Sequence, residues 1–358
     1  MAKPNSPNHV TLRDVAKLSG VSIKTVSRVV NNQGEISEAT RRRIQSAIDQ
    51  SGYRPNILAR SLVNRRTDTL AVVAWGIDYF GPSRAVLGVE QQAAELGYSL
   101  LLNLISEPDR TDVRPILDAL SARRVDGIIW AVPEVGDNRA WFKSEWLAQL
   151  PPTVFLTMAT RPGLSIISAD NRLGAVQATT HLIQHHRRKI GIINGPMRWW
   201  EARERFEGWK ATCLEAGLAI DSDLIAEGDW SAQSGEAGMK KLLARVPDID
   251  AVFVGNDQMA LGALGVIHSM GRRVPQDIAI VGFDNVPESA YFWPPLTTVN
   301  QHIVDIGRTA VQTLHRLIEI HRSEADSEPT TTILATELVI RQSSLLTNDP
   351  AERLNATS

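Results

Sequence analysis

The sequence contains one cysteine, Cys213, in 358 residues. A single thiol excludes a disulfide framework and a metal cluster held by several cysteines, and it suits the reducing cytosol. Apolar runs are short, and none approaches the ~20 residues that a membrane-spanning helix needs. The first nine residues are polar, so we expect neither a signal peptide nor a membrane anchor there. These absences predict a cytoplasmic protein without a membrane partner.

Motifs of several enzyme classes are also missing. The sequence has no glycine-rich dinucleotide fingerprint after a strand, no phosphate loop ending in Lys-Ser/Thr, and no Gly-x-Ser-x-Gly elbow. His181 and His185 have i, i+4 spacing, but no glutamate follows the first histidine and the basic run 187–189 comes next. This pattern favours a surface helix over a metal site. We therefore expect a protein that is not an enzyme and that binds neither metal nor cofactor.

The net charge of −2 hides an asymmetry between two parts of the chain. Residues 1–66 contain 12 Lys and Arg against 4 Asp and Glu, whereas the remaining residues contain 26 against 36. A small basic segment joined to a large acidic one indicates that the first segment meets a polyanion.

The basic segment begins with the pattern of a helix-turn-helix. Apolar residues at helical spacing predict a first helix over 12–18 with Thr11 as its N-cap. Gly20 can take the positive φ of a tight turn, and Ser22 then caps a second helix over 23–30.

A third helix is expected over 38–50, with Ser37 as its N-cap and Gly52 at its end. Two helices that cross closely, followed by a third that closes a small core, make up a helix-turn-helix domain. The residues expected to face this core are Leu12, Val15, Ala16, Leu18, Val26, Val29, Val30, Ile44, Ala47 and Ile48.

The second helix leaves a polar face, and recognition helices present such a face to the major groove. Arg28 has the reach and planar fork for a guanine edge, worth ~1–3 kcal/mol of discrimination, and Lys24 lies one turn earlier. Other side chains would hold phosphates and set the register. The residues expected at this DNA interface are Thr11, Leu12, Ser22, Ile23, Lys24, Thr25, Ser27, Arg28 and Asn31.

Segments 10–16, 20–22 and 25–31 resemble the headpiece of the LacI/GalR family of transcriptional regulators, and 52–62 resembles the family hinge. The resemblance implies that the hinge becomes a short helix only on operator DNA, because an isolated helix of this length is marginal in water. It also implies that Leu62 wedges into a base step from the minor groove and kinks the duplex. The hinge residues expected to contact DNA are Asn56, Ala59 and Leu62.

From about residue 67 onward, short apolar runs alternate with helical stretches. Continuous apolar strands between helices predict parallel sheets covered on both faces, with ligand binding at the carboxyl ends of the strands. The expected strands are 70–74, 99–105, 127–131, 154–157, 189–194, 251–255 and 278–282, and the helices include 86–96, 113–123 and 172–185.

This larger part resembles the two-lobed effector-binding domain of the same family, which is itself similar to periplasmic sugar-binding proteins. The resemblance implies two doubly wound α/β lobes, between which the chain crosses three times. The expected domains are a helix-turn-helix domain over 1–55, a hinge and linker over 56–67, an effector-binding and dimerisation domain over 68–342 (lobe one about 68–169 plus 301–330, lobe two about 170–300 plus 331–342), and a polar tail over 343–358.

The same resemblance implies a set of effector contacts. Arg205 would donate paired hydrogen bonds, Asn256 would offer a donor and an acceptor, and Asp284 would accept from two hydroxyls, a combination that suits a polyol. Trp230 would stack on the apolar face of a sugar. The full expected set is Phe80, Pro82, Thr157, Glu201, Arg205, Trp230, Asn256 and Asp284.

Family members that take galactosides carry polar side chains at the positions of Ala131, Thr157 and Glu201, from which this chain departs. A carbohydrate effector is therefore expected without a galactoside being implied. The pair 199–200, two tryptophans, fits either a sugar platform or hinge packing. Asp257 is expected to cap the helix that follows it rather than to contact a ligand.

Taken together, the sequence predicts a DNA-binding repressor that binds a pseudo-palindromic operator as a homodimer and responds to a small molecule, with a sugar or oligosaccharide as the leading candidate. A purine-like co-repressor is the alternative within the family. A sugar-binding transport protein is a further alternative, which the headpiece disfavours. The tail lacks sustained leucine heptads, so we expect no tetramer.

Overall fold

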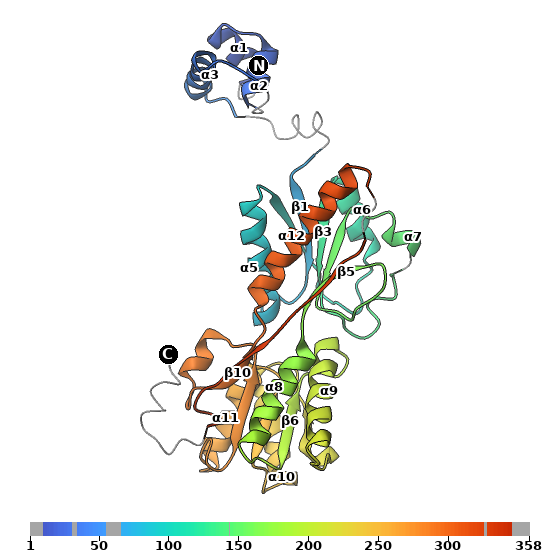
Figure 1. Ribbon diagram of the computed structural model, residues 1–358, viewed down its shortest axis with the longest axis vertical. Coiled ribbons are helices and arrows are strands. Elements are labelled where there is room, and N and C mark those ends of the chain that lie inside the picture. The colour runs from blue at the N-terminus through green and yellow to red at the C-terminus, as the bar shows by residue number, and fades with distance from the viewer. Residues whose placement is uncertain (1–9, 31–33, 55–65, 143, 326–327, 346–358) are drawn as a thin grey trace, which may run out of the picture. The chain divides into compact units, whose positions relative to one another are not determined.

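The computed structural model of this chain separates into two compact units, 1–67 and 68–358 (Figure 1). The residues that the structure describes are 10–30, 34–54, 66–142, 144–325 and 328–345.

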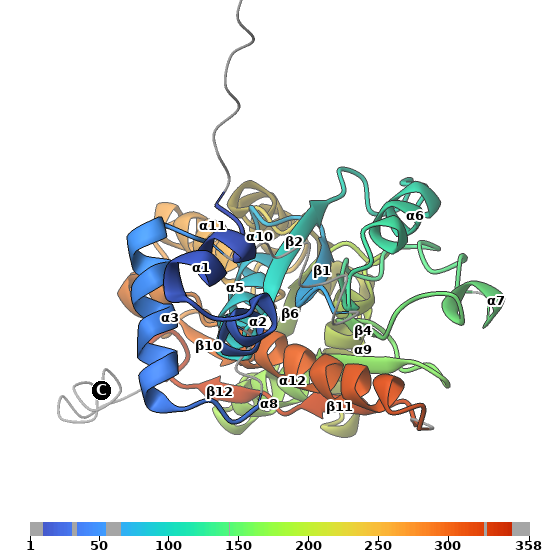
Figure 2. The same ribbon diagram turned by 90° about the horizontal axis from the view of Figure 1, so that it is seen from above.

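The N-terminal unit consists, in its described residues, of three short helices around a small apolar core (Figure 2). The Ser22 Oγ accepts a hydrogen bond from the Thr25 amide (3.1 Å), which confirms the expected cap of the second helix. Gly20 and Gly52 have φ of 64° and 65°, as expected for residues that end helices. The helices are α1 (Leu12–Ser19), α2 (Ile23–Val30) and α3 (Glu38–Ser51).

The core of this unit agrees with the predicted apolar stripe except at Leu18. The Leu18 side chain is 57% exposed, because the last turn of α1 faces the core with Val15, Ala16 and Ser19 instead. The buried apolar residues of the unit are Val15, Ala16, Val26, Val29, Ile44, Ala47 and Tyr53, and those half-buried against them include Leu12, Val30 and Ile48.

The C-terminal unit contains two six-stranded sheets. The first sheet has the order β11-β5-β4-β3-β1-β2 and the second has the order β12-β10-β9-β8-β6-β7. All pairings between these strands are parallel except that of β12 with β10. The strands are β1 (Thr69–Ala74), β2 (Ser99–Leu104), β3 (Gly127–Ala131), β4 (Thr153–Leu156), β5 (Ser165–Ala169), β6 (Ile190–Asn194), β7 (Ile225–Glu227), β8 (Ala251–Val254), β9 (Ala279–Phe283), β10 (Thr297–Asn300), β11 (Thr331–Leu334) and β12 (Glu337–Val339).

Helices cover both faces of each sheet, which confirms the predicted α/β architecture (Figure 1). In the first lobe, α5 and α12 pack on one face, and α6 and the segment around α7 pack on the other. In the second lobe, α10 and α11 cover one face, and α8 and α9 cover the other. The helices are α5 (Phe80–Glu95), α6 (Arg114–Ala122), α7 (Ser144–Leu147), α8 (Asn171–Gln184), α9 (Trp200–Glu215), α10 (Ala232–Arg245), α11 (Asp257–Ser269) and α12 (Ile303–Arg322), with 3-10 turns η1 (Ser222–Leu224) and η2 (Pro287–Tyr291).

The close contact between α5 and α12 depends on two glycines. A Cβ added to Gly88 would lie 2.0 Å from the Val304 carbonyl oxygen, and one added to Gly307 would lie 2.2 Å from that of Ala85. At these two positions a side chain would separate the helices, so glycine is what allows their backbones to approach this closely.

The last crossing between the lobes lies a few residues later than predicted. The segment Thr331–Leu334 pairs in parallel with β5 of the first sheet, and only Glu337–Val339 joins the second sheet beside β10. The assignment of 331–334 to lobe two is therefore wrong, because the backbone hydrogen bonds of β11 belong to lobe one.

The predicted polar tail also begins too early. Ser343 and Ser344 are fully buried. The Ser343 Oγ donates to the Ile280 carbonyl (2.7 Å), and the Ser344 Oγ lies 2.6 Å from the Thr297 Oγ1. Lobe two thus extends beyond residue 342.

His181 contradicts the expectation of a surface helix over this stretch. Its ring is buried and its Nε2 lies 2.8 Å from the Ser344 Oγ. Burial, together with the nearby His185, lowers the pKa of His181 to about 4. Among the described residues, no group of three or more His, Cys, Asp or Glu side chains could hold a metal ion. No described helix is both long and apolar enough to cross a membrane.

Candidate functional site

Helix α2 presents the polar face that the sequence predicted. Ile23, Lys24 and Arg28 are exposed, and Thr25 and Ser27 are half-exposed beside them. Val26 and Val29 face the core from the opposite side of the same helix. The face of α2 that could enter a groove is therefore held by apolar contacts of its other face.

The remaining predicted contacts of this unit lie at helix ends or in its core. The Thr11 amide and hydroxyl donate to the Asp14 Oδ2 (2.9 and 2.7 Å), and these bonds lower the pKa of Asp14. The Ser22 Oγ is occupied at the start of α2, and Leu12 is half-buried against the core. Asn31, Asn56, Ala59 and Leu62, and with them the predicted hinge helix, lie outside the described residues.

A second candidate site lies between the two lobes of the C-terminal unit, at the carboxyl ends of strands from both sheets. It is a pocket whose empty space, with the open mouth included, is about 900 Å³. All eight predicted effector contacts line it. The lining also includes residues absent from the predicted set: Trp75, Tyr79, Ala131, Trp199, Gln258, Gln301, Ile303 and Ile306.

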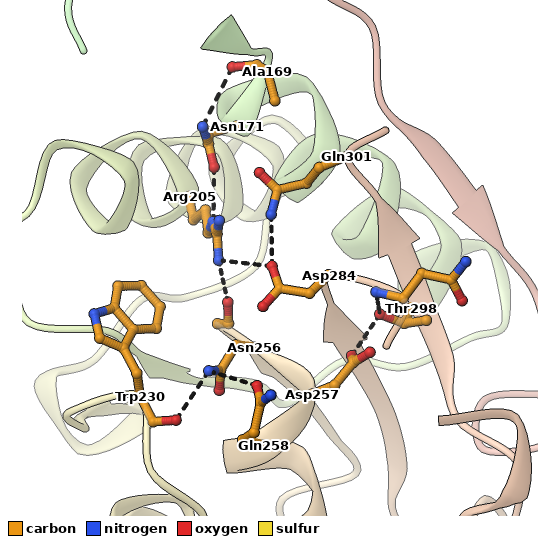
Figure 3. Close-up of polar contacts among 12 residues, drawn as sticks. Ala169, Asn171, Arg205, Trp230, Asn256, Asp257, Gln258, Asp284, Thr298 and Gln301 are labelled. Carbon is orange, nitrogen blue, oxygen red and sulfur yellow. Dashed lines mark hydrogen bonds and ion pairs between the residues drawn. The ribbon is translucent and has the colours of Figure 1, made fainter. Parts of the chain in front are cut away.

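One side of the pocket is polar and is formed by Arg205, Asn256, Asp284 and Gln301; we call it the polar floor (Figure 3). Arg205, at its centre, belongs to helix α9. The guanidinium is 5% exposed; its Nε donates to the Asn171 Oδ1 (2.8 Å) and its Nη1 to the Gly255 carbonyl (2.5 Å). The same Nη1 lies 3.9 Å from the Asp284 Oδ1. The group also lies over the ring of Phe283, 3.8 Å from its centre. Arg205 is thus held in place by the protein itself.

Asp284 stands beside Arg205 at the end of β9, where the backbone has φ of 109°. Its Oδ1 accepts a hydrogen bond from the Gln301 Nε2 (2.6 Å). Burial raises the pKa of Asp284 to about 6, and the Arg205 charge and the Gln301 bond oppose that rise. The protein itself therefore uses one carboxylate oxygen of Asp284. A ligand with two hydroxyls, as the sequence predicted, would donate mainly to the other oxygen.

Asn256 caps helix α11, the role that we predicted for Asp257. Its Oδ1 accepts from the Met259 amide (2.9 Å) and so caps α11, and its Nδ2 donates to the Trp230 carbonyl (3.0 Å). Asp257 is instead fully buried, where its carboxylate accepts from the Thr298 Oγ1 (2.6 Å) and the Val286 amide (2.8 Å). The prediction of Asp257 as the cap is wrong by one residue, because the strand ends at residue 254 and leaves Asn256 in the extended cap position.

A row of aromatic rings forms one wall. Trp75 stacks on Tyr79 with 5.4 Å between ring centres, and it lies 5.2 Å from Trp199. Trp199 in turn meets Trp230 at 5.9 Å. Gly195 leaves room for Trp230, since a Cβ there would come within 2.0 Å of the indole ring. Trp199 thus lines the pocket, and both possibilities for the pair stay open because Trp199 also bridges to Val135 of the other lobe.

Glu201 lies in the first turn of α9, is 9% exposed and lines the pocket. Burial raises its pKa to about 7, against the opposing charges of Arg205 and Arg139. Ala131 and Thr157, the other two positions that depart from galactoside-binding relatives, line the same pocket. The three positions at which this chain differs from galactoside-binding relatives therefore all line one pocket.

Two loops join the lobes beside the pocket, and we name residues 134–136 and 198–200 the interlobe clasp. Val135 and Trp199 form an isolated antiparallel bridge. The Gly136 amide donates to the Arg198 carbonyl (2.8 Å) and the Trp200 amide to that of Glu134 (3.0 Å). An ion pair between Arg198 and Asp109 (2.5 Å) lies next to them. Because Trp199 belongs to the clasp and to the pocket wall, lobe contact and pocket shape are linked.

Comparison with known proteins gives matches in both units. Residues 11–56 match the family model described as bacterial regulatory proteins of the lacI family, and residues 179–344 match a periplasmic binding protein-like domain. The regulator CelR of Thermobifida fusca is 36% identical over 93% of this chain and 98% of its own. The repressor PurR of Haemophilus influenzae (strain PittEE) is 33% identical over 93% of this chain and 98% of its own.

Solved structures of related regulators also match this chain over nearly its whole length. The lac repressor dimer bound to operator and the anti-inducer ONPF matches 94% of this chain and 99% of its own, with 31% identity and a TM-score of 0.83. A CelR–cellobiose complex matches 93% of this chain and 99% of its own, with 34% identity and a TM-score of 0.68. With a matching headpiece and relatives that align over nearly the whole length, this chain belongs to the lacI family of bacterial regulatory proteins.

Proposed function

We propose that this chain is a cytoplasmic, sequence-specific DNA-binding repressor that occupies a pseudo-palindromic operator as a homodimer and is controlled by a sugar in the interlobe pocket. The observation that carries the proposal is the pairing, in one lacI-family chain, of an exposed recognition-type helix with a pocket that has an aromatic wall and a polar floor. Aromatic faces beside hydrogen-bonding groups suit the apolar faces and hydroxyls of a sugar.

The DNA contacts proposed are those of α2 and its neighbours, with Arg28 and Lys24 reading base edges. Two copies of α2 in successive major grooves of one operator require a two-fold dimer. Ligand binding would change the relation of the two lobes and so the population of the operator-binding state. A coupling of ~1–3 kcal/mol is typical of such a switch.

The test is a selection of operator sequences from a random DNA library with the purified full chain, followed by titration with cellobiose and other sugars. We expect enrichment of an inverted repeat and a change of operator affinity with at least one sugar. Light scattering should give the mass of a dimer. Enrichment of no symmetric motif, or a tetramer, would contradict the proposal.

A purine-like co-repressor is a second candidate, favoured by the similarity to PurR. A flat base could also lie against the aromatic wall. Guanine and hypoxanthine therefore belong in the same titration, and a purine that strengthens operator binding while sugars have no effect would select this alternative.

A further inference from the structure

The turn that follows strand β9 has an unusual backbone, and we name its residues 284–286 the pocket turn. Asp284 and Asn285 have φ of 109° and 51°, a region that favours glycine and that residues with a side chain rarely adopt. Strained backbone of this kind persists only where the surrounding structure holds it. Because Asp284 lines the pocket, whatever holds the pocket turn also determines where the Asp284 carboxylate lies.

The three backbone amides of the pocket turn are all bound by residues outside it. The first donates to the Val299 carbonyl (2.8 Å). The second donates to the Thr298 Oγ1 (3.3 Å), and the third donates to the Asp257 Oδ2 (2.8 Å). The Thr298 Oγ1 itself donates to the Asp257 Oδ1 (2.6 Å; Figure 3). The backbone of the pocket turn is thus anchored to strand β10 and to the start of helix α11.

The Asn285 side chain is held separately, by Arg341, which follows strand β12. The Arg341 Nη2 donates to the Asn285 Oδ1 (2.8 Å). Its Nη1 donates to the Leu296 carbonyl (2.8 Å) and to the Ser289 Oγ (3.2 Å). A planar guanidinium offers several N–H groups in a fixed fork, so one side chain ties the pocket turn to η2 and to the residue before β10.

Arg341 reaches this position because the chain has crossed between the lobes for the last time. Strand β12 pairs with β10, with Val339 opposite Thr298, and the Arg341 amide donates to the Thr297 Oγ1 (2.8 Å). The Arg341 side chain is half-buried, and it is not among the described residues that line the pocket. The final segment of lobe two therefore contacts the pocket turn without contacting the pocket.

The place of the Asp284 carboxylate depends on this turn. Its Oδ1 accepts from the Gln301 Nε2 (2.6 Å) and lies 3.9 Å from the Arg205 Nη1 (Figure 3). Without the Arg341 contact, Asp284 and Asn285 could return to a negative φ, where residues with a side chain are more stable. The Cα–Cβ bond of Asp284 would then point in another direction, and the carboxylate would leave Gln301 and Arg205.

We propose that Arg341 is a positioning residue of the pocket, which holds the pocket turn in its strained conformation and so keeps the Asp284 carboxylate directed into the pocket. Arg341 acts through Asn285 and not by touching a ligand. The inference rests on the proposed function in one respect, the use of Asp284 for effector binding. The position of the carboxylate can be measured without a ligand or an operator.

The first experiment follows the Asp284 carboxyl group by carbon-13 NMR, in the full chain labelled at the side-chain carboxyl carbon of aspartate. The Asp284 signal is the one that Asp284→Asn loses. In the wild type, burial raises the pKa of Asp284 to about 6, against Arg205 and the Gln301 bond. Arg341→Met should lower this pKa by at least about one pH unit, toward the ordinary value of about 4, because the carboxylate leaves its buried place for the open pocket.

Two further variants separate the geometry from the charge of Arg341 and from folding. Arg341→Lys keeps the positive charge, but an ammonium lacks the fork that reaches Asn285 and Leu296 together, so the pKa of Asp284 should fall here too. Asn285→Ala removes the acceptor of Arg341 and should have the same effect, which keeps the test available if an Arg341 variant does not fold. A pKa of about 6 in folded Arg341→Lys or Asn285→Ala would overturn the proposal.

Two controls should leave the pKa of Asp284 at about 6. Arg273→Met removes an exposed arginine that pairs with Asp277 before the other end of β9. Ile249→Val lowers stability by removing one methyl group from the core of lobe two. A fall in Ile249→Val as large as that in Arg341→Lys would assign the effect to general loosening and overturn the proposal. Failure of the proposed function would appear elsewhere, as the absence of a symmetric operator or of any ligand response.

Discussion

At the scale of single residues, Arg28 occupies an exposed position on α2 while its neighbours Val26 and Val29 face the core. Arg28→Ala should therefore reduce the ratio of operator to random-DNA affinity by about 1–3 kcal/mol, the value of one bidentate base contact. Fluorescence anisotropy with both DNAs measures the ratio. Arg42→Ala, an exposed charge on α3, serves as the control because loss of a general charge lowers both affinities together. An unchanged ratio in Arg28→Ala would contradict the assignment.

The raised pKa of Glu201 makes the free energy of unfolding depend on pH. Its pKa is about 7 in the folded chain against 4.5 as the reference, mainly because of burial, with Arg205 and Arg139 opposing and Glu134 adding to the rise. The folded state thus holds this proton more tightly, and the cost of ionising Glu201 appears as pH rises from about 4.5 and is complete above about 7.

Glu201→Gln removes that cost. Without ligand, the variant should be more stable than the wild type at pH 8, by up to about 3 kcal/mol, and the difference should shrink toward pH 5. Denaturant unfolding of the C-terminal unit in the full chain at both pH values provides the measurement. A gain that is equal at pH 5 and pH 8 would show that the ionisation of Glu201 is not its cause.

At the scale of elements, the contact of α5 with α12 depends on bare backbone. Gly88→Ala would place a methyl group 2.0 Å from the Val304 carbonyl oxygen, so the helices must separate. We expect a loss of about 1–3 kcal/mol in the free energy of unfolding, the usual cost of overpacking. Gly265→Ala on α11 is the matched control: its added Cβ meets nothing within 4 Å, and alanine should stabilise that helix by up to about 1 kcal/mol. Equal effects of the two would contradict the close-contact argument.

The interlobe clasp allows a kinetic prediction. Arg198→Ala removes the exposed ion pair with Asp109, which is worth about 0.2–1 kcal/mol, while the backbone bridge of Val135 with Trp199 remains. The dissociation rate of a bound sugar should rise by up to about 5-fold, with unfolding little changed. Stopped-flow tryptophan fluorescence, with Trp199 beside the ligand, measures the rate. A rate equal to that of the wild type would show that this ion pair does not hold the lobes together.

At the scale of the whole molecule, the charge is divided between the two units. Residues 1–66 carry an excess of eight positive charges, and the remainder carries an excess of ten negative ones. Operator affinity should therefore fall steeply with salt, with a log–log slope of about −0.9 for each phosphate neutralised. Affinity measured from 50 to 200 mM salt tests this, and a slope near zero would exclude phosphate contacts as a main source of binding.

Much of this organisation could be read from the sequence because it depends on local patterns. Helical spacing and capping residues predict α1, α2 and α3, and apolar runs between helices predict β1, β2, β3, β4, β6, β8 and β9 but not β5, β7, β10, β11 and β12. Leu18 shows the limit of such patterns. Its spacing fits an inward stripe, yet the last turn of α1 buries Ala16 and Ser19 and leaves Leu18 57% exposed.

The amino-acid sequence by itself thus determined the two units, the exposed polar face of α2 and the set of residues at the carboxyl ends of strands. Only the tertiary structure decided which lobe receives Thr331–Leu334, that Asn256 rather than Asp257 caps α11, and that Trp75 and Gln301 join the pocket. Within the described residues, it also leaves the Glu201 Oε2 without a hydrogen-bond partner. Most of these outcomes depend on contacts between different elements of the fold, such as Trp75 with Trp199 or Asp257 with Thr298, and local spacing carries no information about such contacts.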